Sequence, residues 1–123
     1  MEPKITFSID SVTFNTSCVN LFPDHQHVVF NIDVENQRLI LEPCPAYDKD
    51  SLKFANLQDG KNAPCKCITK VFCALLYSMM GWNQSAKYTI LAIYQEFGDK
   101  QIIVFNLDES LSLPLTAPYS AIN

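Results

Sequence analysis

The chain contains the same pattern twice: an apolar run, a short polar turn and a second apolar run. The first copy, NIDVENQRLILEP, spans residues 31–43, and the second copy, AIYQEFGDKQIIVFNLDE, spans residues 92–109. Each copy predicts a β-hairpin, because apolar runs on both sides of a polar turn are typical of paired strands. One hairpin with one helix is marginal in water, so each copy needs a larger core than it builds alone.

A helix-like stretch precedes each hairpin, which indicates two related halves. The order strand, helix, strand, turn, strand fits residues 1–43 and again 66–109, with a connector over 44–65. Arg38 of the first half aligns with Gln101 of the second half, 63 residues later. Packing around a pseudo-twofold axis would give both halves a shared core. The alternative is two unrelated hairpins in an α+β domain.

The expected fold is therefore an α+β domain over 1–109, in which two pseudo-repeated halves pack as one small mixed or antiparallel sheet or barrel. We expect five to seven strands and two helices, with one strand running through AKYTILAIYQ, and an extended or weakly ordered tail over 110–123. Asn15, Thr16 and Ser17 are candidate N-caps of the first helix. The second helix, KVFCALLYSMM, ends at Gly81. Its wide apolar stripe is predicted to pack centrally through Val71, Phe72, Leu75, Leu76 and Met79.

Length and composition fit one compact domain. The chain has 123 residues, of which 48% are hydrophobic, which suffices for a buried core. The longest apolar run in a helix-like stretch, residues 71–80, is too short to span a bilayer. The N-terminal MEPKITFSID lacks the apolar core of a signal peptide, so we expect a cytoplasmic protein with no membrane partner.

Five cysteines in a chain expected in the cytosol indicate reduced thiols rather than a disulfide framework. Cys18 and Cys73 are interpreted as small buried apolar residues on the two helices. The best candidate metal site combines the motifs HQH and CKC, whose four side chains would suit tetrahedral zinc: His25, His27, Cys65 and Cys67. Structural zinc sites usually use C-x₂₋₄-C spacing, so we expect neither a metal nor another cofactor.

Catalytic signatures are weak in this sequence. The three glycines lie too far apart for a phosphate-binding loop, and no G-x-S-x-G motif occurs. A nucleophilic pair of a thiol with His25 or His27 has no local support. We therefore predict a protein without enzymatic activity.

Charge is distributed unevenly along the chain, whose net charge is −4. Residues 1–43 carry −4, residues 44–70 carry +2 and residues 71–123 carry −2. The predicted protein-binding residues are the acids that flank the two hairpins: Asp33, Glu35, Glu42, Asp99, Asp108 and Glu109. Trp82 is a candidate anchor for a partner, although a tryptophan after a helix also commonly packs under the next strand.

Two resemblances bear on function. The segment FNTSCVNLFPDHQHVVFNIDVENQRLILEP resembles one half of the AbrB-type swapped-hairpin DNA-binding regulators, whose tandem-repeat relatives place two halves in one chain. That family presents arginines to DNA, and the first half here offers only Arg38. The segments FNTSC, RLILEPC and MMGWN also resemble small proteins carried by mobile DNA of Gram-positive gut bacteria. Such proteins include counter-defence inhibitors of the anti-CRISPR type.

The leading hypothesis is a non-enzymatic inhibitor or modulator of a nucleic-acid-handling protein. Its acidic faces would occupy the basic nucleic-acid-binding surface of that larger protein. The alternative is a tandem swapped-hairpin regulator that binds DNA through the lysine-rich segment 49–70.

Overall fold

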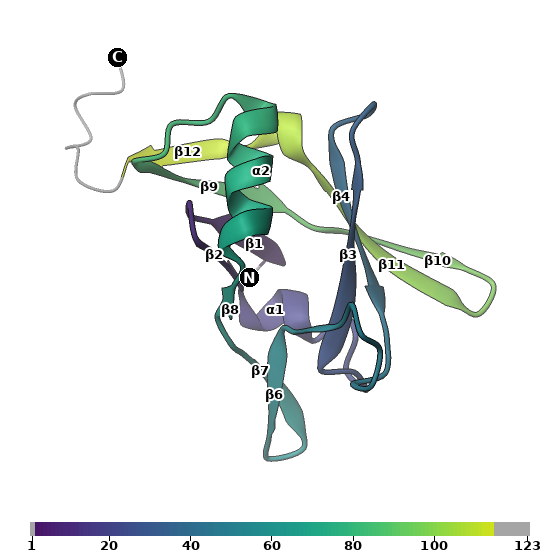
Figure 1. The fold of residues 1–123 in the computed structure, drawn as a ribbon. Coiled ribbons are helices and arrows are strands. Elements are labelled where there is room, and N and C mark those ends of the chain that lie inside the picture. The colour runs from purple at the N-terminus through teal and green to yellow at the C-terminus, as the bar shows by residue number, and fades with distance from the viewer. Residues whose placement is uncertain (1, 115–123) are drawn as a thin grey trace.

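The computed structural model describes residues 2–114, which form two antiparallel sheets with a helix against one of them (Figure 1). Sheet A has the strand order β12-β9-β1-β2-β8, and sheet B has the order β10-β11-β4-β3-β5. The strands of sheet A are β1 (Lys4–Phe7), β2 (Ser11–Phe14), β8 (Cys67–Ile68), β9 (Ala86–Leu91) and β12 (Leu111–Pro114). The strands of sheet B are β3 (His27–Asp33), β4 (Arg38–Pro43), β5 (Leu52–Lys53), β10 (Ile93–Phe97) and β11 (Lys100–Asn106).

Three further elements and a small hairpin complete the described part of the chain. They are α1 (Thr16–Val19), α2 (Lys70–Met80), the 3₁₀ helix η1 (Leu107–Glu109), and the hairpin of β6 (Ala55–Gln58) with β7 (Lys61–Pro64). The hairpin and β5 lie in the predicted connector 44–65. Of the predicted tail 110–123, the first part pairs through β12 with β9, and residues 115–123 lie outside the described residues. No helix in the described part of the chain is long and apolar enough to cross a membrane.

The prediction of a small antiparallel α+β fold is confirmed, but the single sheet or barrel is wrong. Residues 2–114 contain two separate open sheets of five strands each and the two-stranded β6–β7 hairpin, which are more strands than the five to seven expected. The predicted strand AKYTILAIYQ is in fact two strands, β9 in sheet A and β10 in sheet B, separated by Ala92. The Ala92 N–H donates to the Pro3 carbonyl at 2.9 Å. The alternation of inward and outward side chains continues while the chain changes sheet, because the core is contacted on both sides of Ala92 by Tyr88, Ile90 and Tyr94.

The two predicted hairpins, β3–β4 and β10–β11, lie side by side in sheet B and share one register. Asp33 pairs with Arg38 in the first hairpin, and Glu96 pairs with Gln101 in the second. Each residue of the second pair lies 63 positions after its counterpart in the first pair. The β10–β11 hairpin extends away from the rest of the molecule (Figure 1). The structure does not confirm a repeat of two whole halves, because α1 has 4 residues, α2 has 11, and β9 follows only α2.

The core between the sheets is aromatic. Phe14 contacts Phe54 edge-on, with ring centroids 5.4 Å apart, and Phe22 also packs on Phe54. Cys18 and Cys73 are fully buried, as predicted for small apolar side chains. Asn15 caps α1 by accepting the Cys18 N–H on its side-chain oxygen, which confirms one of the three candidate caps.

The predicted central stripe of α2 is wrong at two of its five positions. Val71 and Leu75 are 85% and 62% exposed, whereas Leu76 is fully buried. Phe72 and Met79 are half-buried at the edge of the core. The helix covers only one face of sheet A, so a stripe wider than the contact leaves its outer half in solvent. The predicted stop at Gly81 is confirmed, because this residue adopts a left-handed conformation with φ of 66°.

The contact face of α2 is fixed by one tyrosine. The Tyr77 hydroxyl lies 2.8 Å from the Ala86 carbonyl and 3.1 Å from the Phe7 carbonyl, and donates to these two strands of sheet A. Burial raises the pKa of this hydroxyl, so it stays protonated and able to donate. The helix is thereby held on sheet A by a polar contact as well as by Leu76 and Cys73.

Candidate protein-binding surface

The six predicted acidic residues gather at opposite ends of sheet B. Because β4 and β11 are antiparallel, the turn of the first hairpin lies beside the end of the second. The Leu107 N–H donates to the Gln37 carbonyl at 2.9 Å and closes this junction. We call the resulting group the acidic end: Asp33, Glu35, Asp108 and Glu109. Glu42 and Asp99 lie at the other end of the sheet, so each group draws on both hairpins rather than on one.

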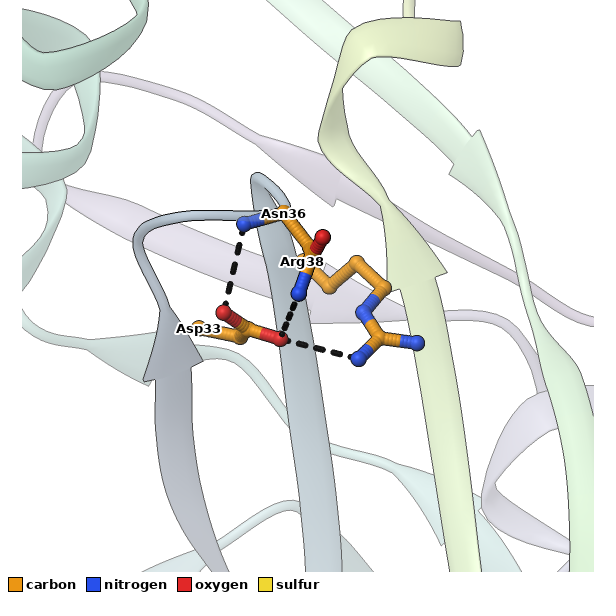
Figure 2. Close-up of polar contacts among 3 residues, drawn as sticks. All are labelled: Asp33, Asn36 and Arg38. Carbon is orange, nitrogen blue, oxygen red and sulfur yellow. Dashed lines mark hydrogen bonds and ion pairs between the residues drawn. The ribbon is translucent and has the colours of Figure 1, made fainter.

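Asp33 is engaged within the protein (Figure 2). Its Oδ2 accepts from Arg38 Nη2 at 2.8 Å and from the Asn36 side chain at 2.9 Å, and its Oδ1 accepts from the Asn36 N–H at 3.2 Å. These hydrogen bonds, the Arg38 bond above all, lower the pKa of Asp33 to about 2. Arg38 in turn keeps Nε buried with no hydrogen-bond partner in the described residues. The Asp33 carboxylate is therefore engaged in hydrogen bonds that stabilise the turn, which leaves it less available to a partner.

Acidification should release the Asp33 carboxylate from this turn only at very low pH. We expect the carboxyl carbon of Asp33 to titrate near pH 2 by NMR, below the ordinary value of about 3.9. The folded-state pKa is depressed, so the stabilisation is complete above about pH 4 and is lost as the pH falls toward 2. Asp33→Asn should remove that part of the acid dependence of unfolding. A titration midpoint near the ordinary value would contradict the network.

The remaining acids of the acidic end are free to face a partner. Glu35, Asp108 and Glu109 are exposed, and none of them forms an ion pair within residues 2–114. Val34 lies between Asp33 and Glu35 in the turn and is 64% exposed. The sequence reasoning missed Val34, although an apolar residue inside the polar turn D-V-E-N was visible in the sequence. The acidic end thus combines three solvent-facing carboxylates with one apolar contact point.

The opposite end of sheet B is closer to neutral. Glu42 Oε1 and Lys100 Nζ form an ion pair at 3.0 Å. An open groove of about 560 Å³ lies here, lined by Glu42, Pro43, Phe97, Gly98, Asp99, Lys100 and Gln101. The ion pair cancels part of the acidic charge, so this end is the weaker candidate for a basic partner.

Trp82 lies in an aromatic cluster against sheet A. Its ring stacks on Tyr88 with centroids 4.3 Å apart, and meets Tyr77 edge-on at 5.2 Å and Phe7 at 5.6 Å. These contacts fit the packing role that was the alternative to a surface anchor, and since Trp82 is only half-buried, its role as an anchor stays a prediction. It lies on sheet A, whereas the acidic end belongs to sheet B.

The four candidate zinc ligands do not form one group in the structure. The Cys65 and Cys67 thiols both donate to the Lys53 carbonyl, at 3.3 Å and 2.9 Å. Burial raises the pKa of Cys67 to about 12, which opposes the thiolate form that a metal requires. Among residues 2–114, no three His, Cys, Asp or Glu side chains are grouped as metal ligands, so His25 and His27 do not join the cysteines in a site.

No family model, no curated protein and no solved structure matches this chain. The convergence of acids at one end of sheet B is the strongest functional feature that the described residues offer. Its three unpaired carboxylates come from sequence segments more than seventy residues apart, and the β4–β11 pairing brings them together.

Proposed function

We propose that this protein is a non-enzymatic binding protein that occupies the basic, nucleic-acid-binding surface of a larger protein. A counter-defence inhibitor of the anti-CRISPR type carried by a mobile element would act in this way. The observation that carries the proposal is the convergence of Glu35, Asp108 and Glu109 beside the exposed side chain of Val34. Basic channels that bind phosphate backbones attract such a surface electrostatically.

The carboxylates and Val34 are expected to affect different steps of binding, which follows from the chemistry of their side chains. Exposed carboxylates raise the association rate over a range of about a Debye length, roughly 8–10 Å at physiological salt. Val34 supplies an apolar contact worth about 1.5–3 kcal/mol when fully buried at an interface. Charge would therefore govern how fast the partner is found, and Val34 would contribute to how long it is held.

A purely binding role also fits the state of the nucleophilic side chains. Burial raises the pKa of all five cysteines, and the Cys65 and Cys67 thiols hydrogen-bond to a carbonyl. Thiols in that state are poor nucleophiles.

The proposal is tested by reversing charge at the acidic end. Immobilised wild-type protein is compared with the triple variant Glu35→Lys, Asp108→Lys and Glu109→Lys for proteins retained from a host lysate. We expect a retained nucleic-acid-binding protein whose association with the triple variant is slower by about tenfold or more at low salt. The wild-type protein should also displace DNA or RNA from that purified partner.

A second triple variant, Glu2→Lys, Asp24→Lys and Asp50→Lys, makes the same change in net charge on exposed residues elsewhere. It should keep the association rate of the wild type. Equal slowing in both variants would show that only net charge matters. A retained partner whose nucleic-acid binding is unaffected would refute inhibition by occupancy.

We also propose that the two hairpins, residues 27–43 and 93–106, are a structural repeat. Their pairings coincide at the same shift of 63 residues, and β4 and β11 meet in antiparallel fashion at the centre. Side-by-side hairpins are the feature that favours the second candidate, a tandem DNA-binding regulator of the AbrB type. A gel shift with duplex DNA separates the two candidates, because a regulator would bind with a marked salt dependence.

A further inference from the structure

The outer face of sheet A carries a patch of hydroxyl groups between two lysines. The strand register places side chains in two adjacent rows on the face that points away from the core. The first row runs across the sheet as Lys87, Ser8, Ser11 and Ile68, and the second row runs as Thr89, Thr6, Thr13 and Lys66. The two lysines therefore occupy opposite borders of the patch, one on β9 and the other next to β8.

The hydroxyl groups of the patch are partly connected to one another. Ser8 and Ser11 lie 2.8 Å apart at their Oγ atoms, and Thr6 and Thr89 lie 3.1 Å apart at their Oγ1 atoms. Ser11 is 4% exposed and forms the floor of the patch. Thr13 is exposed, and its hydroxyl makes no hydrogen bond to another residue within 2–114. Thr13 thus keeps a donor available for a ligand.

These residues line a cavity of about 160 Å³, formed by Thr6, Ser8, Ser11, Thr13, Lys66 and Lys87. Its two borders are three strand spacings apart, roughly 14 Å at the backbone, so flexible lysine side chains from both borders can reach over it. Neither lysine takes part in an ion pair among the described residues. Two lysines without an ion-pair partner in the described residues thus line the same cavity as the hydroxyl groups.

We infer that this cavity binds the phosphate group of a small molecule. Ammonium and hydroxyl groups are donors that suit the oxygens of a tetrahedral oxyanion. A cavity of about 160 Å³ is smaller than the roughly 300–1,000 Å³ of sites for drug-sized ligands, which suits one phosphate group rather than a whole nucleotide. The site lies on sheet A, whereas the acidic end lies on sheet B, so this inference does not depend on the proposed function.

The surroundings favour a small ligand over a nucleic acid. Asp10 lies in the turn at the edge of the patch. Its Oδ1 accepts a hydrogen bond from Ser8 Oγ at 3.1 Å. The chain as a whole carries a net charge of −4. A long polyanion running past the cavity would meet this net charge along its length, whereas a single phosphate group would meet only the Asp10 carboxylate together with Lys66 and Lys87.

The test is an NMR titration of the amide groups at constant ionic strength. The probes are inorganic phosphate, glycerol phosphate as a simple phosphate monoester, and a single-stranded oligonucleotide. We expect saturable shifts at Ser8, Ser11 and Lys87 with one of the two small probes, and the tighter of these identifies free or esterified phosphate. The double variant Lys66→Gln and Lys87→Gln should weaken this binding by about tenfold or more.

The matched control is Lys49→Gln with Lys61→Gln, which removes two exposed lysines elsewhere on the surface. It should bind the small probe as the wild type does. Three results would overturn the inference: shifts that do not saturate, an equal loss of binding in the control, or tighter binding of the oligonucleotide at the same residues.

Discussion

Leu76→Ala is expected to lower the free energy of unfolding by about 2–5 kcal/mol, whereas Leu75→Ala should lower it by less than about 0.5 kcal/mol. The two leucines are neighbours on α2, but Leu76 is fully buried against the core and Leu75 is 62% exposed. Truncating Leu76 leaves a cavity between α2 and sheet A, which the surrounding side chains fill only in part. Truncating Leu75 removes a side chain that already lies mostly in solvent.

Urea unfolding followed by tryptophan fluorescence measures both changes, since Trp82 is the single tryptophan and packs next to Tyr77 of α2. The slope of the transition should stay unchanged in both variants, because the surface exposed on unfolding is nearly the same. A large loss for Leu75→Ala with a small loss for Leu76→Ala would mean that the helix is rotated about its axis. Leu75 would then be the core residue that its place in the apolar stripe suggests.

Asn62→Ala should destabilise the protein by about 3 kcal/mol, an unusually large effect for a polar residue. The Asn62 side chain is 2% exposed, and its Nδ2 donates at 2.8–2.9 Å to the carbonyls of Val19, Phe22 and His25. Its Oδ1 accepts from the Gln26 side chain at 2.9 Å. Alanine removes the donor from the Val19 carbonyl at the end of α1 and from the His25 carbonyl, whereas the Phe22 carbonyl still accepts from the His25 N–H at 3.1 Å.

Thermal and urea unfolding of Asn62→Ala test this prediction, with Gln84→Ala as the control. Gln84 carries the same amide group but is exposed in the turn after α2, so its replacement should change stability by less than about 0.5 kcal/mol. Asn62→Asp should be at least as damaging as Asn62→Ala, because a carboxylate presents oxygen where three carbonyls need a donor. A loss below about 1 kcal/mol for Asn62→Ala would show that water replaces the side chain at these carbonyls.

Local patterns in the sequence predicted the elements of this fold better than their assembly. Both hairpins, the helix that ends at Gly81 and the cap at Asn15 follow from turn residues, alternation and capping chemistry. The division into two sheets does not, because residues 86–94 keep one alternation while the chain passes from one sheet to the other. The inner face of α2 was also ambiguous, since its apolar stripe is wider than the strip that sheet A covers.

For the candidate site, the sequence identified the acidic residues but not their neighbours. The β4–β11 pairing, a contact between residues more than sixty positions apart, decides that Asp108 and Glu109 join Asp33 and Glu35. Local spacing carries no information about such a pairing. The same limit applies to the hydroxyl patch of sheet A, whose members come from β1, β2, β9 and the segment before β8.

The passage of the chain through Ala92 has a consequence for cooperativity. One continuous segment, residues 86–97, supplies an inner strand to sheet A and an edge strand to sheet B. If sheet A opened, β9 would leave its partners and pull on the start of β10, so the cost of opening one sheet includes strain on the other. We therefore expect the two sheets to unfold together, with local opening more frequent in parts outside this segment, such as the β6–β7 hairpin.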